Sequence, residues 1–137
     1  MKQKLAQILA FVGAVICVVI PLLFAFNQGG QLFPMPGLYF LEIALFGLIG
    51  LASVIGETFP IPQRRLAPWV AAGMLLAFNV LGIWTIGLFL LPGTISFLGA
   101  GFLSMSDSSP PILQGLGWFL LAAIVQAALI LALVQFF

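Results

Sequence analysis

Glu42 is the residue with the strongest potential for chemistry, because it is a carboxyl side chain inside a long apolar segment, residues 37–56. It lies six residues into that segment, about 8 Å from its end at the rise of an α-helix. An ionisable group within a membrane span is functional by default. Ser53 falls on the same helical face, which predicts that Glu42 points into a helix bundle or toward a partner. In the structural alternative, Glu42 reaches interfacial water or is protonated and hydrogen-bonded.

Two amide side chains, Asn79 and Gln126, are the other strongly polar residues inside apolar segments. Within a membrane such amides commonly hydrogen-bond across helices, and each contributes about 0.5–2 kcal/mol. We therefore predict that both side chains join helices and that neither binds a ligand. Together with Glu42 and Ser53, they are the candidate intramembrane polar contacts.

The charged residues Glu57, Arg64 and Arg65 lie in the most polar stretch of the chain, residues 57–65. We interpret them as an ion-pair cluster at the cytoplasmic interface that fixes the orientation of the protein. Binding of anionic lipid headgroups is the alternative, although two arginines are fewer than the roughly 4–8 basic residues typical of such sites.

Catalytic and metal-binding constellations are absent from the sequence. The chain has no histidine, which is the commonest general base and metal ligand. Its single cysteine, Cys17, lies in an apolar run where a small buried hydrophobe is expected. The two lysines, Lys2 and Lys4, stand at the N-terminus, far in sequence from any serine or threonine. We therefore expect no enzymatic activity, no metal and no cofactor.

Membrane helices must position the polar residues, because charged residues make up 5% of the chain against about 25% in a soluble domain. The four basic residues form no cluster that indicates nucleic acid as a partner. Because a helix needs about 20 apolar residues to cross the hydrocarbon layer, the sequence predicts an all-α integral membrane bundle. We expect a single transmembrane domain over 1–137 with five transmembrane helices, at about 5–26, 37–56, 66–83, 86–105 and 112–137. The first is expected to be an uncleaved span, since its apolar run is long enough to cross.

The uncharged stretch 66–105 is too long for one crossing, since a helix of that length would extend about 60 Å. Two short spans meeting in a turn near residues 82–87, with Trp84 at the interface, form one solution. In the other, one span ends at Pro92-Gly93 and a re-entrant half-helix follows, which gives four spans plus a re-entrant segment. The hairpin leaves fewer backbone groups without partners and is favoured.

The basic residues also predict the orientation of the chain. All of them lie at the N-terminus or at Arg64 and Arg65, and no lysine or arginine occurs between Lys4 and Arg64. The positive-inside rule places these segments on the cytoplasmic side. We therefore expect a cytoplasmic N-terminus in a multi-pass protein of the bacterial plasma membrane.

The stretch RRLAPWVAAGMLLAFNVLGIWTIGLFLLPGTISFLGAGFLSM, residues 64–105, resembles a class of small, uncharacterised bacterial multi-span membrane proteins. Those proteins typically carry a basic pair, a short span, a glycine turn and a second span with an early proline. The chain departs from them in its last span and its non-basic C-terminus. The resemblance implies the hairpin over 66–105 and implies no function.

The absence of a catalytic site, of a soluble domain and of long loops favours a non-catalytic accessory or structural subunit of a larger membrane complex. Respiratory and photosynthetic assemblies are candidate hosts. The expected partners are membrane lipids and other membrane subunits or copies of the chain itself. A small oligomeric transporter or channel component that uses Glu42 is the alternative, although such proteins usually have more than one intramembrane charge.

Overall fold

The computed structural model describes residues 1–27, 29, 37–55, 61–105 and 112–136. Within this part of the chain every regular element is an α-helix, and no strand occurs. The five helices are α1 (Lys2–Asn27), α2 (Gly37–Ile55), α3 (Ile61–Leu81), α4 (Gly87–Met105) and α5 (Ile112–Phe136). The all-α class predicted from the sequence is therefore confirmed.

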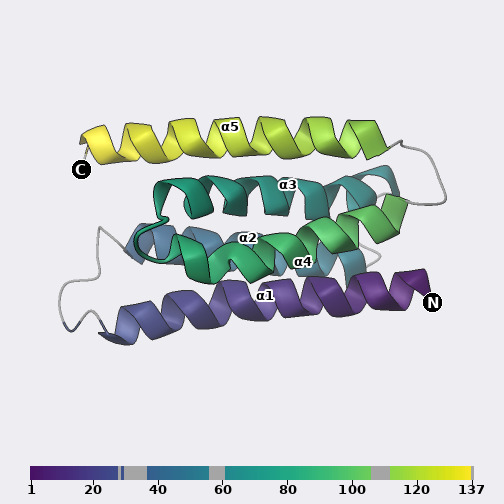
Figure 1. The fold of residues 1–137 in the computed structure, drawn as a ribbon, viewed down its shortest axis with the longest axis horizontal. Helices are drawn as coiled ribbons and strands as arrows, with labels where there is room; N and C mark the ends of the chain where they lie inside the picture. The colour runs from purple at the N-terminus through teal and green to yellow at the C-terminus, as the bar shows by residue number, and fades with distance from the viewer. Residues whose placement is uncertain (28, 30–36, 56–60, 106–111, 137) are drawn as a thin grey trace.

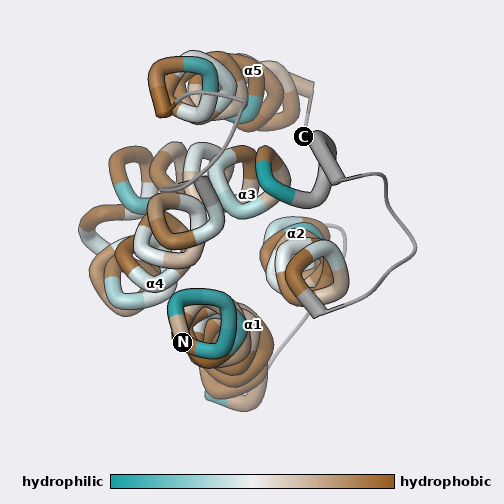
Figure 2. The backbone as a smooth tube through the Cα atoms, turned by 90° about the vertical axis from the view of Figure 1, so that its right-hand side faces the viewer, coloured by the Kyte–Doolittle hydropathy of each residue, from teal (hydrophilic) through white to brown (hydrophobic). Residues whose placement is uncertain are grey.

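The first four helices form a closed ring, and α5 lies outside it. α1 packs against α2 and α4, and α3 packs against the same two helices. α5 packs on α3 and touches α4 only slightly. Figure 2, a view along the helices, shows α5 above α3, with α1 on the far side of the bundle. α3 is thus the helix through which α5 is attached.

Phe97 of α4 is fully buried and fills the centre of the ring. Its aromatic ring lies against Gly13 of α1 and Gly50 of α2, where an added Cβ would come within 2.9 Å and 2.7 Å of it. Small residues let membrane helices approach closely, and van der Waals packing then holds them together. Because both positions are glycine, the Phe97 side chain fits at the centre of the four helices.

Four helices, α1, α2, α4 and α5, are long and apolar enough to cross a membrane. The chain is therefore a multi-pass membrane protein. In α3 the apolar part is shorter and runs over Arg65–Leu81. Figure 1 shows the five helices side by side with nearly aligned axes, and α3 and α5 begin at the end of the bundle where the N-terminus lies.

The chain reverses between α3 and α4 in a turn over residues 82–86. The amide of Gly87 donates to the carbonyl of Gly82 at 2.7 Å. An added Cβ at Gly87 would lie 2.6 Å from that carbonyl oxygen, so the close approach requires glycine. Trp84 projects from the turn and is 94% exposed. The helical hairpin predicted for this part of the chain is present.

The alternative with a break at Pro92-Gly93 is wrong, because α4 continues through both residues. Proline is tolerated inside a membrane helix where neighbouring helices and serine or threonine side chains satisfy the backbone groups that it frees. In addition, the Ser96 hydroxyl donates to the Pro92 carbonyl at 2.8 Å, and the Thr94 hydroxyl donates to the Leu90 carbonyl at 3.3 Å. The segment after Pro92 is therefore the continuation of a full-length helix.

Candidate functional site

The structure brings Glu42 of α2 and Gln126 of α5 together. The Gln126 amide nitrogen Nε2 donates a hydrogen bond to Glu42 Oε1 at 2.8 Å. Gln126 is 1% exposed, whereas Glu42 is half-buried. Two of the polar residues singled out in the sequence thus form one contact between two helices.

Tyr39 provides a second, weaker connection between the same helices. Its hydroxyl donates to the backbone carbonyl of Ile130 at 3.5 Å, the outer limit for such a bond. Tyr39 precedes Glu42 by about one turn on α2, and Ile130 follows Gln126 by about one turn on α5. The two connections therefore have the register of antiparallel helices.

The position of Gln126 follows from the narrow stripe through which α5 packs. The buried residues of α5 are Gly115, Ala122, Gln126 and Ile130, spaced as on one face of a helix. The first two are small and let α5 lie directly on α3. Gln126, the long polar member of the stripe, extends past α3 and reaches α2.

Asn79 and Thr94 form a second polar pair, between α3 and α4. Asn79 Nδ2 donates to Thr94 Oγ1 at 2.6 Å, and both side chains are buried. Asn79 Oδ1 has no hydrogen-bond partner among the described residues. Sequence reasoning did not single out Thr94, although a hairpin turn near residues 82–87 places it across from Asn79. This pair holds the hairpin together.

Ser53 does not join the Glu42 contact. Ser53 is buried, and its hydroxyl donates to the Gly50 carbonyl of its own helix at 2.7 Å. Arg65 is half-buried near the start of α3. Glu57 and the Arg64 side chain lie outside the described residues, so the predicted interfacial ion pair stays a prediction.

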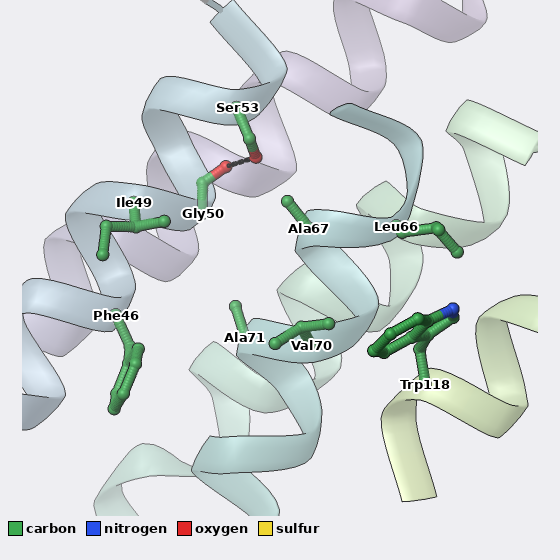
Figure 3. Close-up of a pocket in the computed structure, with 9 residues that line it drawn as sticks. All are labelled: Phe46, Ile49, Gly50, Ser53, Leu66, Ala67, Val70, Ala71 and Trp118. Carbon is green, nitrogen blue, oxygen red and sulfur yellow. Dashed lines mark hydrogen bonds between the residues drawn. The ribbon is translucent and has the colours of Figure 1, made fainter. Parts of the chain in front are cut away.

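Two apolar cavities lie between α2, α3 and α5, one on each side of the Glu42–Gln126 bond. The first, about 410 Å³, lies toward the start of α3 and is shown in Figure 3. The second, about 380 Å³, lies toward the turn between α3 and α4. Residues of α2, α3 and α5 line both cavities. The hydrogen bond joins α2 to α5 between them.

This arrangement contains a carboxyl–amide hydrogen bond with apolar surroundings. Among the described residues, no group of three or more histidine, cysteine, aspartate or glutamate side chains is placed to hold a metal ion. Comparisons with protein-family models, with curated proteins and with solved structures return no match.

Proposed function

We propose that this chain is a non-catalytic accessory or structural subunit of a larger membrane protein complex. The observation that carries the proposal is the Glu42–Gln126 bond at 2.8 Å. The intramembrane carboxyl group, on which a transport mechanism would depend, accepts a hydrogen bond from another helix of the same chain. Hydrogen bonds of this kind commonly hold membrane helices together.

The exposed side of α5 supports the same proposal and is the surface on which a partner would bind. Opposite the buried stripe of α5 lie Gly117, Ile124 and Ala128, all exposed. An added Cβ at Gly117 would have no atom within 4 Å. Small residues on a lipid-facing side allow close approach of another helix. The partner is a membrane subunit or a second copy, and membrane lipids cover the remaining surface.

We further propose that the chain crosses a bacterial plasma membrane five times, with its N-terminus on the cytoplasmic side. The apolar part of α3, Arg65–Leu81, is close to the lower limit of about 17 residues for a span. α3 lies between α2 and α4 in the ring, which supports the same depth for all three helices. Lys2, Lys4 and Arg65 lie at one end of the bundle, which supports the orientation.

Cysteine accessibility tests this orientation. A cysteine at Gln28 should react with a membrane-impermeant thiol reagent in intact cells, and a cysteine at Gln63 should react only after the membrane is permeabilised. The native Cys17 is fully buried, and the variant Cys17→Ala provides an unlabelled background. If only the Gln63 variant were labelled in intact cells, the proposed orientation would be wrong and the N-terminus would lie on the outer side of the membrane.

Substitutions of Glu42 test the function. The variant Glu42→Gln keeps a hydrogen bond to Gln126, so it should co-purify with the same partner subunits as the unchanged chain. The variant Glu42→Leu should lose about 1–2 kcal/mol of bundle stability and recover fewer partners. The double variant Glu42→Leu/Gln126→Leu should recover part of that loss, because it leaves no buried amide without a partner.

The transport alternative predicts a different pattern for the same variants. An amide cannot release a proton, so Glu42→Gln should then be as damaging as Glu42→Leu in proton-coupled uptake into liposomes. Normal assembly combined with loss of uptake in the Glu42→Gln variant would refute the accessory role. If the Glu42→Leu variant fails to assemble and no variant, nor the unchanged chain, shows proton-coupled uptake, the accessory role is supported.

A further inference from the structure

We propose that Glu42 forms an ion pair with a basic side chain of a different membrane subunit, whose transmembrane helix packs against the first half of α2. This pairing rests on the proposed function, because it gives the chemistry of the partner that an accessory subunit requires. It follows from the hydrogen bonds of the carboxyl group, from the location of every basic residue of the chain and from the exposed side chains around Glu42.

The carboxyl group of Glu42 is satisfied only in part by its own chain. Gln126 Nε2 donates to Glu42 Oε1 at 2.8 Å, and among the described residues this is the one hydrogen bond that the carboxyl group makes. A carboxylate has two oxygens and about four acceptor sites. Glu42 is half-buried, and its second oxygen, Oε2, is not enclosed by the described part of the chain. Oε2 can therefore accept a hydrogen bond from another molecule.

The basic residues of the chain are far from Glu42. All four belong to the first turns of α1 and α3, namely Lys2, Lys4, Arg64 and Arg65. Both helices begin at one end of the bundle, whereas Glu42 lies near the start of α2 at the other end (Figure 1). Leu66, the residue after Arg65, shares a cavity with Ser53, which is roughly 16 Å from Glu42 along α2. Residues 28–36, which precede α2, include no charged residue. A counter-ion for Glu42 has to come from another molecule.

A second copy of the chain in the same orientation cannot supply this counter-ion, because its basic residues lie at the far end of the bundle as well. Ionisable residues inside a membrane commonly pair with one another. Complementary charges across an interface also select the partner and fix its register. The partner is therefore a different subunit, with a lysine, arginine or histidine at the depth of Glu42, about 8 Å from the end of the helix.

The surface of α2 around Glu42 has space for a partner helix. Leu38, Leu41 and Leu45 are all exposed, and their spacing of three and four residues places them in one stripe beside Glu42, as in helices that interlock through their side chains. In Figure 2 no helix lies on the outer side of α2. A helix that packs on these three leucines brings a long basic side chain within reach of Oε2. This surface is additional to the exposed side of α5.

Photo-crosslinking in intact cells tests the pairing on the full-length chain. The amino acid p-benzoylphenylalanine replaces Leu45, about one turn from Glu42, and mass spectrometry identifies the segment to which it crosslinks. The same amino acid in place of Leu23, an exposed residue near the matching end of α1, provides the control for neighbours that do not contact α2. We expect the Leu45 position to capture a transmembrane segment that the Leu23 position does not capture. That segment should have a basic residue within one helical turn of the crosslinked residue.

A double-mutant cycle then decides whether that basic residue pairs with Glu42. Glu42→Gln removes the charge and keeps the bond to Gln126, so its effect does not come from a loosened α5. Because a half-buried ion pair contributes modestly, crosslinking from Leu45 should fall on the order of fivefold, while mild detergent still recovers the partner. Replacing the partner's basic residue with methionine should have an effect of the same size, and the two changes together should have no larger effect than either alone. Unchanged crosslinking in Glu42→Gln, or two effects that multiply, would overturn the pairing.

The identity of the captured molecule separates failure of this pairing from failure of the proposed function. A second copy of the chain at the Leu45 position, or a subunit whose crosslinked segment has no basic residue, would overturn the ion pair and would leave the role in assembly in place. Capture of lipid alone, from a chain that also purifies without any other subunit, would overturn both the ion pair and the accessory role.

Discussion

Replacing Gly73 with leucine is expected to destabilise the protein by about 3 kcal/mol and to release α5 from α3. An added Cβ at Gly73 would overlap the backbone carbonyl of Phe119 and would lie 3.0 Å from the Ala122 methyl group. Because the obstructing atom belongs to the backbone, no side-chain rearrangement relieves the overlap and the helices must separate. The measurement is the free energy of unfolding, from titration of mixed micelles with a denaturing detergent.

Gly117 provides the matched control, since it lies on α5, the other helix of this interface, but faces away from the bundle. An added Cβ there would have no atom within 4 Å. Gly117→Leu should therefore change the free energy of unfolding by no more than about 0.5 kcal/mol. Similar losses in the two variants would mean that leucine acts through backbone entropy or lipid contacts, and the proposed packing of α5 on α3 would be wrong.

The same substitution bears on the proposed function, because α5 has few other attachments. Beyond α3, its described contacts are slight packing on α4 and the two hydrogen bonds to α2. Gly73 is buried at the α3–α5 interface and cannot touch a partner on the outer side of α5. Loss of partner subunits from the Gly73→Leu variant, with retention in Ala52→Leu, a change to the same residue at an exposed position of α2, would therefore show that a correctly docked α5 is needed for assembly.

Helix positions were predictable from the sequence because apolar runs in a membrane protein end where the chain meets polar surroundings. The second and fourth predicted spans, 37–56 and 86–105, differ from the observed helices Gly37–Ile55 and Gly87–Met105 by one residue at one end. The third helix differs more: it begins at Ile61, five residues before the predicted span at 66. Hydropathy detects only the apolar part of a helix, whereas proline is tolerated in a first helical turn. The helix therefore includes polar residues that precede the apolar part.

The contact between Glu42 and Gln126 could not be predicted, because the two residues are 84 positions apart in the chain. Helices that are apolar on all sides carry no periodic signal that says which face is buried. The pairing depends on α5 lying outside a ring of four helices, and no residue pattern specified that arrangement. Sequence reasoning nevertheless identified both side chains, since amide and carboxyl groups are rare inside a membrane and need partners there.

Trp69 was also missed, although the glycines that surround it carry a partial signal. The indole is fully buried, and an added Cβ at Gly101 of α4 or Gly115 of α5 would come within 2.8 Å or 2.6 Å of it. Small residues predicted close helix approach, but the sequence did not indicate which large side chain they accommodate. Trp69 thus joins α3 to both α4 and α5 through two glycine contacts.

Trp69→Ala is accordingly expected to lower the free energy of unfolding by about 3–5 kcal/mol. The indole fills the space between three helices and packs against Phe102, with ring centroids 4.8 Å apart. Van der Waals packing is the main source of association between membrane helices, so the cavity left by alanine removes contacts that lipid cannot replace. Unfolding in mixed micelles, compared with the unchanged chain, measures the loss.

Trp69→Phe separates the packing of the ring from the chemistry of its N–H group. Trp69 Nε1 is buried and has no hydrogen-bond partner among the described residues. Phenylalanine keeps most of the aromatic packing and removes that donor, so the loss should be less than about 1.5 kcal/mol. A loss as large as that of Trp69→Ala would contradict this account, because it would mean that the indole N–H forms a hydrogen bond on which the bundle depends.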